Sequence, residues 1–170
     1  MKWVKAIVAG LVAGLVMFIV LAVGTKTGMA PINVPPSAAF LAATTGIQSP
    51  PLAGLLHFAY AALGSVLLVA LFGRRTNILK GIGLALVLWL ILMVIYSPII
   101  GWGFFGAGGL NHQLPPTSPL YIGPAGMYVL ITLVLHAIYG LIVGWMDQVW
   151  IDWTERSGAD PDQSENLASH

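Results

Sequence analysis

The chain has 170 residues, of which 58% are hydrophobic and 8% charged, against about 25% charged in an ordinary soluble domain. So few charges cannot cover the surface of a soluble protein, and the composition predicts an all-α integral membrane protein. The net charge of +1 gives no indication of a nucleic-acid partner, and the absence of cysteine excludes disulfides, Cys-ligated zinc and iron–sulfur clusters.

Two apolar stretches in the first half are long enough to cross a bilayer. They cover about residues 6–24, between Lys5 and Lys26, and about residues 51–73, ended by Arg74 and Arg75. A helix of about 20 residues spans the ~30 Å hydrocarbon layer. The first stretch is longer than the roughly 7–15 residues typical of a secretory signal peptide, so we expect it to be retained as a helix.

Two further apolar stretches follow in the second half. The third covers about residues 78–97, where Pro98 interrupts it, and the fourth covers about residues 124–146. Apolar and tryptophan residues recur at helical spacing after the fourth stretch, which predicts an interfacial extension of this helix to residue 153. The polar tail, residues 154–170, is expected to be disordered.

Basic residues predict the orientation. Six of the seven fall on one side of the predicted spans: Lys2, Lys5, Arg74, Arg75, Lys80 and Arg156. Lys26 alone falls on the other side. The positive-inside rule therefore places both termini in the cytoplasm.

The two predicted external segments are unusual for their length. Residues 27–50 and 98–123 contain almost no charge, apart from Lys26 at the edge of the first and any proton on His112. Loops of this length are usually functional or disordered. We expect these segments to lie on the membrane surface, to re-enter the membrane, or to contact a partner.

The two halves of the chain share short motifs in the same order and at nearly one offset. Val-Pro-Pro-Ser at 34–37 matches Leu-Pro-Pro-Thr at 114–117, and Leu-His-x-x-Tyr at 56–60 recurs at 135–139. This pattern predicts two tandem two-helix repeats with parallel orientation, related by an axis along the membrane normal. The predicted repeats are residues 1–75 and 76–153.

Four residues of the repeated motif are candidate ligand-binding residues. His57 and Tyr60 share one face of the second span, as His136 and Tyr139 share one face of the fourth. The histidines could ligate a b-type haem or a metal ion, or each side chain could simply make an inter-helix hydrogen bond. At 1.5 Å per residue, His57 lies about 9 Å and His136 about 18 Å from the start of its helix. The two are level only if the fourth helix is shifted toward its C-terminal extension.

Small residues recur at four-residue intervals in all four predicted spans. They are Gly10 and Gly14, Ala61 and Ser65, Gly81 and Ala85, and Gly140 and Gly144. Such pairs let helix backbones approach closely, which matters in lipid because no hydrophobic effect drives helices together there. We expect them to pack within the bundle, with dimerisation as the alternative.

No catalytic arrangement is visible. Residues 1–146 contain no Asp or Glu, so no carboxylate is expected at membrane depth, which argues against a proton- or cation-coupled transporter. Ser65 is isolated within its helix, with no base and no orienting group beside it in the sequence. We therefore predict no enzyme and no metal site.

Three short motifs carry a resemblance to a known family. They are Leu-His-x-x-Tyr at 56–60, Gly-Arg-Arg at 73–75 and Gly-Pro-Ala-Gly at 123–126. Over about residues 5–150 the chain resembles the YagU-like group, small bacterial inner-membrane proteins of unknown function. The resemblance implies a multi-pass protein of the bacterial cytoplasmic (inner) membrane, and it implies no chemistry.

Three functions remain open from the sequence. The first is a non-enzymatic accessory subunit or small scaffold that packs against a protein partner or a second copy of itself. The second is a carrier that binds haem b, quinone, lipid or metal between the second and fourth helices. The third is a permeation path for small solutes along the pseudo-twofold axis. No cofactor is expected under the first hypothesis.

Overall fold

The computed structural model describes residues 2–108 and 110–156, and four helices in this part of the chain are long and apolar enough to cross a membrane. The helices are α1 (Lys2–Lys26), α2 (Pro36–Thr45), α3 (Pro50–Phe72), α4 (Ile78–Ile91), α5 (Ser97–Ile100) and α6 (Ala125–Arg156). Short 3₁₀ turns cover Gly73–Arg75, Phe104–Gly106 and Leu110–Gln113. No strand forms among the described residues, and the predicted all-α fold with four helices long and apolar enough to cross a membrane is confirmed.

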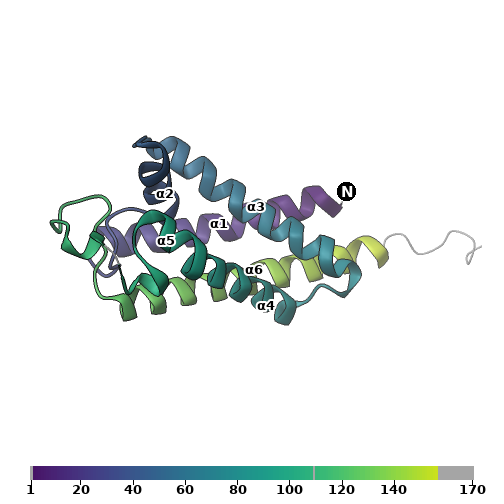
Figure 1. Cartoon of the computed structure of the whole chain (residues 1–170). Helices are drawn as coiled ribbons and strands as arrows, with labels where there is room; N and C mark the ends of the chain where they lie inside the picture. Colours follow the sequence, from purple (N-terminus) through teal and green to yellow (C-terminus); the bar gives the residue numbers. More distant parts are fainter. Residues whose placement is uncertain (1, 109, 157–170) are drawn as a thin grey trace, which may run out of the picture.

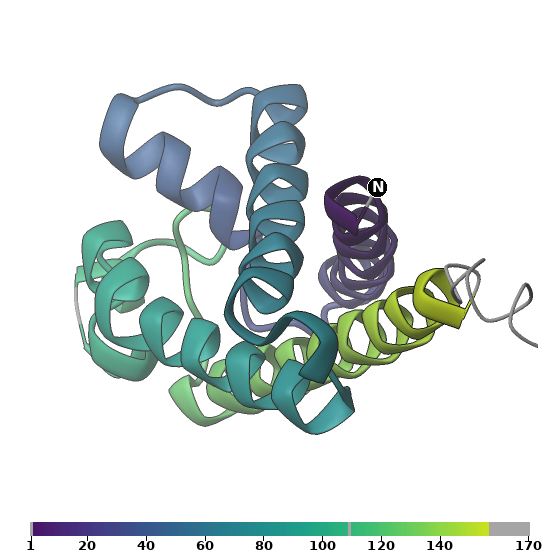
Figure 2. The same ribbon diagram turned by 90° about the vertical axis from the view of Figure 1, so that its right-hand side faces the viewer.

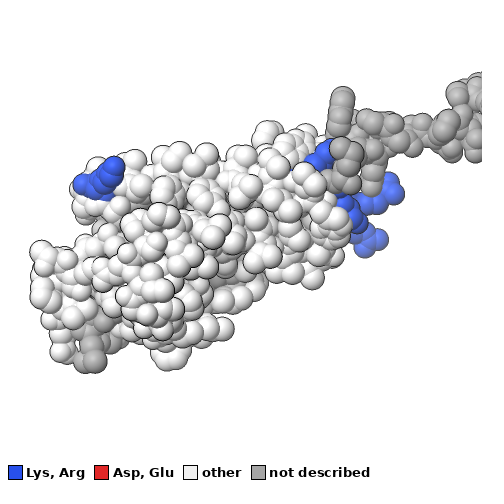
Figure 3. All heavy atoms as spheres, turned by 90° about the horizontal axis from the view of Figure 1, so that it is seen from above, with Lys and Arg blue, Asp and Glu red and all other residues white. Residues whose placement is uncertain are grey.

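The long helices all run between the two ends of the molecule, with α3 inclined to α6 (Figure 1). The start of α1, the end of α6 and the loop between α3 and α4 share one end of the molecule, which we call the terminal end. The helices α2 and α5 and the segment that leads into α6 lie at the opposite end, which we call the distal end. Figure 3 shows Lys and Arg side chains gathered at the two ends of the face in view, with an uncharged surface between them.

The third span continues to Ile100 instead of ending at residue 97 as predicted. A π-helical turn, Leu92–Tyr96, follows α4 and leads directly into α5. Proline has no N–H and its ring crowds the carbonyl one turn earlier. The wider π turn just before Pro98 changes the hydrogen-bond pattern at this point, and the helix continues. It ends at Gly101, whose φ of 92° is the left-handed conformation typical of a helix C-terminus.

Helix α6 is longer than a membrane crossing requires. It continues past Asp147 as predicted, and it includes residues 154–156, which the sequence assigned to the tail. The rest of the predicted disordered tail, residues 157–170, lies outside the described part of the chain.

The α1–α3 crossing is built from small residues. A Cβ atom added to Gly10 would lie 2.5 Å from the carbonyl oxygen of Ala61, and one added to Gly14 would lie 2.8 Å from the Ala61 side chain. Neither distance is sterically possible without movement of α1 or α3. The two backbones are therefore close enough to exclude larger side chains at this crossing.

The α4–α6 crossing has the same character. Gly81 packs against the backbone of Gly140 and Gly144, with no room for a Cβ atom. A Cβ added to Gly140 would lie 2.7 Å from the side chain of Ala85. The small residues of both crossings are thus used in packing within the chain.

The two segments predicted to be external pack against each other at the distal end. Ile32 and Ile122 form an antiparallel bridge, and the N–H of Gly123 donates to the carbonyl of Pro31 over 2.7 Å. The Asn33 amide donates to two carbonyl groups of the second segment, over 2.7 and 2.8 Å. Many polar backbone groups of these uncharged segments are therefore satisfied within the fold, which the sequence did not predict.

Candidate functional site

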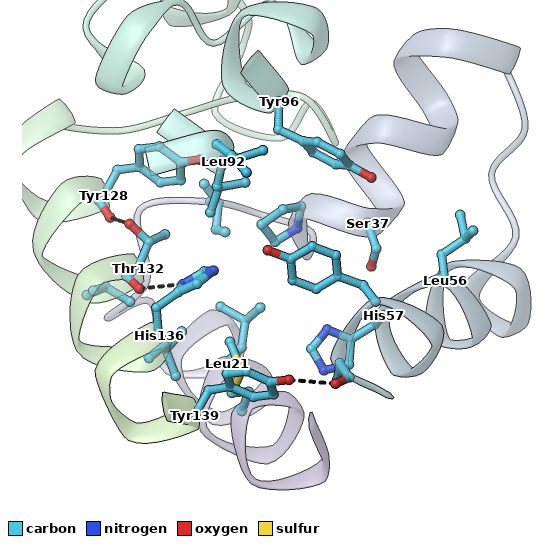
Figure 4. A pocket seen from close by; sticks show the side chains of 18 of the residues that line it. Leu21, Ser37, Leu56, His57, Leu92, Tyr96, Tyr128, Thr132, His136 and Tyr139 are labelled. Carbon is cyan, nitrogen blue, oxygen red and sulfur yellow. Dashed lines mark hydrogen bonds between the residues drawn. The ribbon is translucent and has the colours of Figure 1, made fainter. Parts of the chain in front are cut away.

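A cavity of about 130 Å³ lies inside the distal half of the bundle (Figure 4). Its walls come from all four spans, from α2 and from the segment between α1 and α2. The lining residues are Met17, Leu21, Pro31, Ile32, Pro36, Ser37, Leu56, His57, Tyr60, Ala61, Ile91, Leu92, Tyr96, Tyr128, Ile131, Thr132, Leu135, His136 and Tyr139. The four candidate residues of the repeated motif, two from α3 and two from α6, are all among them.

The cavity exists because α3 and α4 diverge. They are joined by a short loop at the terminal end and separate toward the distal end, where α2 lies across the space between α3 and α5 (Figure 2). Phe40 of α2 stacks on Tyr96 of the π turn, with ring centroids 4.4 Å apart, and this contact holds α2 in place. The π turn also supplies Leu92 and Tyr96 to the cavity wall.

The three lining residues with the largest exposed fractions mark the opening of the cavity. They are Leu56 (37%) and Tyr60 (39%) on α3, and Ile91 (40%) on α4. All three lie within membrane-spanning helices. The cavity therefore opens sideways, between α3 and α4, on a face that a bilayer would cover.

His57 and His136 line the same cavity from opposite walls (Figure 4). Their different distances from the starts of their helices do not separate them. The sequence required the fourth helix to be shifted toward its C-terminal extension for the two histidines to be level. Helix α6 does extend well beyond the length of the other spans at the terminal end.

Both histidines hydrogen-bond to backbone carbonyl groups. His57 Nε2 lies 2.9 Å from the carbonyl oxygen of Gly14 on α1, and His136 Nδ1 lies 2.8 Å from that of Thr132 one turn earlier on α6. A carbonyl oxygen can only accept, so each of these ring nitrogens carries a hydrogen. In the neutral form of the rings, the unprotonated nitrogens are Nδ1 of His57 and Nε2 of His136.

The two tyrosines of the repeated motif differ in their surroundings. Tyr139 is buried, and its hydroxyl group donates to the carbonyl of Ala61 on α3 over 2.6 Å. Tyr60 is at the cavity opening, and its hydroxyl group makes no hydrogen bond to any described residue. The site is thus less symmetric than the sequence repeat.

Several residues of the site were not anticipated from the sequence. Thr132 donates to the carbonyl of Tyr128 over 2.7 Å and accepts a hydrogen bond from the indole N–H of Trp89 over 3.1 Å. The hydroxyl groups of Tyr128 and Ser97 lie 2.7 Å apart. Tyr128, Thr132, His136 and Tyr139 recur at intervals of four, four and three residues, a helical stripe of polar groups that the sequence contained.

The same face of α6 carries a buried carboxylate, which corrects the expectation from the sequence. Asp147 is 1% exposed, and one of its carboxylate oxygens accepts a hydrogen bond from the Ser65 hydroxyl group over 3.1 Å. Ser65 is about 10 Å inside the end of α3, at 1.5 Å per residue. Ser65 is therefore not isolated, and Asp147 lies within the bundle because α6 continues beyond it.

Among the described residues, no group of three or more His, Asp or Glu side chains is placed to hold a metal ion. No family model, curated protein or solved structure matches the chain. The function of the cavity must therefore be inferred from its own geometry.

Proposed function

We propose that the protein binds a small, uncharged and largely apolar molecule taken from the membrane, in the cavity between α3 and α6. The observation that carries this proposal is the cavity itself. It is enclosed by five helical elements, its wall is mainly apolar, and a few polar groups converge on it, which is typical of small-molecule sites.

The position of the opening supports a ligand that is soluble in lipid. The opening lies between two membrane-spanning helices, bordered by Leu56, Tyr60 and Ile91. At the distal end, α2 and the paired segments cover the cavity from the aqueous side. A molecule dissolved in the bilayer reaches such an opening by lateral diffusion, whereas a water-soluble one does not.

The absence of charged groups around the cavity limits the ligand. None of the described residues that line it is Lys, Arg, Asp or Glu. An ionised head group would lose its hydration there without gaining a counter-ion, which is strongly unfavourable. The site therefore favours a neutral ligand over a phospholipid head group or a fatty-acid carboxylate.

The histidine geometry supports an organic ligand better than haem b held between the two imidazoles. Axial ligation through both rings needs an unprotonated nitrogen from each, directed at one iron. The Nε2 atom of His57 is engaged with the Gly14 carbonyl, so only the more crowded Nδ1 atom, next to the ring's attachment to Cβ, is left.

The packing of the small residues within the chain argues against the accessory-subunit hypothesis. The small-residue helix faces were one of the grounds for that hypothesis, although the sequence also allowed them to pack within the bundle. In the structure, Gly10, Gly14, Gly81, Gly140 and Gly144 all contact other helices of the same chain.

We further propose an orientation with both termini in the cytoplasm of a bacterium, in its inner membrane, and an origin by duplication of a two-helix unit. The basic residues of the terminal end support this orientation. The duplication is supported by equivalent contacts: Gly10 packs on Ala61 in the first pair of helices, and Ala85 packs on Gly140 in the second. Ala61 and Gly140 are separated by the same offset as the repeated histidines.

Native mass spectrometry of the protein, extracted from its own membrane in mild detergent, tests the proposal. We expect a discrete additional mass on the wild-type chain. Ile131→Trp should abolish this mass, since Ile131 lines the cavity and an indole ring would fill it. Leu130→Trp is the matched control, since Leu130 is the adjacent residue on α6 and is 56% exposed on the outer surface.

Each result of this experiment has a clear meaning. Loss of the mass in Ile131→Trp and its retention in Leu130→Trp would support ligand binding in the cavity. A wild-type protein without any additional mass, or a mass retained in both variants, would overturn the proposal. A larger assembly with defined protein companions and an empty cavity would favour the accessory-subunit hypothesis instead.

A further inference from the structure

We infer that the ligand carries a neutral, hydroxylated aromatic ring of the hydroquinone type, which donates a hydrogen bond to Nε2 of His136. This inference rests on the proposed ligand-binding function and specifies the chemistry of the ligand. It follows from which hydrogen-bonding groups of the cavity are already engaged and which are not.

The most deeply placed unengaged polar atom of the cavity is an acceptor. His136 is 6% exposed, and its Nδ1–H is committed to the Thr132 carbonyl. No described residue hydrogen-bonds to its Nε2. Every fully enclosed side-chain polar atom among the described residues has a hydrogen-bond partner, so this Nε2 is not fully enclosed. The Nε2 atom is therefore accessible from the cavity, and Figure 4 shows the His136 ring reaching from α6 into it.

Most donors on α6 are engaged, whereas the lining hydroxyl groups of Tyr60, Tyr96 and Ser37 make no hydrogen bond to a described residue. The Tyr139 hydroxyl hydrogen goes to Ala61, and the Thr132 hydroxyl hydrogen goes to the preceding turn of α6. The Tyr128 hydroxyl group is paired with Ser97. A ligand with only carbonyl or ether oxygens can accept from those hydroxyl groups, but it leaves the acceptor on His136 unpaired, at a cost that a ligand with an O–H group avoids.

The shape and composition of the wall favour a ring over an alkyl alcohol. Six of the lining residues are aromatic: His57, Tyr60, Tyr96, Tyr128, His136 and Tyr139. Aromatic side chains arranged around a cavity provide both edges and faces for contact with a flat ring. An apolar chain on the ring would leave through the opening beside Leu56 and Ile91 and remain in the lipid.

Equilibrium binding to the full chain in lipid nanodiscs tests the inference. The four probes are decyl-substituted benzohydroquinone, the corresponding quinone, the hydroquinone dimethyl ether and decanol. The measurement is made under anaerobic conditions with a reductant for the hydroquinone, which is compatible with a chain that contains no cysteine. The quinone and the ether keep the ring and the chain but have no donor, whereas decanol keeps the donor but has no ring.

We expect the hydroquinone to bind about tenfold more tightly than the quinone or the ether, because these leave a buried acceptor unpaired. We expect decanol to bind more weakly than the hydroquinone. His136→Phe should reduce the affinity for the hydroquinone to that for the ether, while Leu130→Phe on the outer surface of α6 should change neither affinity. The comparison of probes uses the unmodified protein, so it remains decisive if His136→Phe does not fold.

Equal affinities for the hydroquinone, the quinone and the ether would overturn this inference and leave the proposed function intact. Decanol binding as tightly as the hydroquinone would overturn the assignment of a ring. Failure of all four probes, although native mass spectrometry shows a cavity-dependent mass, would overturn the inference alone. If that mass is also missing, the proposed function itself is wrong.

Discussion

The hydroxyl group of Tyr139 on α6 donates a hydrogen bond of 2.6 Å to the backbone carbonyl of Ala61 on α3. This contact joins the two helices at the side of the cavity that faces the terminal end. Gly64 provides the space for it, since a Cβ atom there would lie 2.6 Å from the Tyr139 hydroxyl group. Tyr139 therefore acts as a structural residue, whereas its counterpart in the repeat, Tyr60, is free to contact a ligand.

The first prediction compares these two tyrosines. Tyr139→Phe should destabilise the protein by about 0.5–1.5 kcal/mol, the usual net value of one hydrogen bond between membrane helices. Tyr60→Phe removes a hydroxyl group that bonds to no described residue, so the free energy of unfolding should remain unchanged. Unfolding by SDS in mixed micelles, followed by tryptophan fluorescence, measures both values. Equal losses in the two variants would contradict the assigned roles.

The second prediction concerns the α4–α6 crossing. Gly81→Ala places a methyl group against the carbonyl oxygen of Gly140, so α4 and α6 must move apart. We expect a destabilisation of about 1–3 kcal/mol, as for other overpacked sites. Gly83→Ala is the matched control on the same helix, because nothing lies within 4 Å of its added Cβ atom. An unfolding experiment in which both variants behave alike would show that this crossing is not tightly packed.

The sequence predicted the four spans because each is a long apolar stretch bordered by charges or turn residues, and a bilayer permits little else. It did not predict that the third span continues past Pro98 or that Asp147 is buried within the bundle. Both features depend on the groups that surround these residues in the fold. Before Pro98 a π turn changes the local hydrogen-bond pattern. At Asp147 the Ser65 hydroxyl group donates a hydrogen bond to the buried carboxylate.

The candidate site was predicted in part. The repeated motif identified His57 and His136, and the structure places both on one cavity. Tyr96 and Ser37 were not identifiable, because they reach the cavity only through the π turn and through α2, a helix in a segment predicted to be a loop. Tyr128 and Thr132 follow the same helical stripe as His136, and a search for polar residues at helical spacing would have found them.

The third prediction concerns the orientation in the membrane. The chain contains no cysteine, so single cysteines can be introduced as unambiguous labels. Gln48→Cys lies in the exposed turn between α2 and α3 at the distal end, and Ser164→Cys lies in the polar tail after α6. In intact cells a membrane-impermeant maleimide should label the first variant and not the second. The reverse pattern would contradict the proposed cytoplasmic location of the termini, and labelling of both after lysis is the control for reactivity.

The fourth prediction concerns the buried pair at the terminal end. Ser65→Ala should destabilise the protein by about 1–3 kcal/mol, because it leaves the enclosed Asp147 carboxylate without its hydrogen-bond donor. Asp147→Leu removes the carboxylate, so adding Ser65→Ala to it should cost much less. A double-mutant cycle, measured by SDS unfolding, should then give a coupling energy of about 1 kcal/mol or more. Additive effects of the two substitutions would mean that Ser65 does not stabilise the carboxylate. Because Ser65 and Asp147 lie outside the cavity lining, neither substitution should remove a cavity-bound mass from the folded protein.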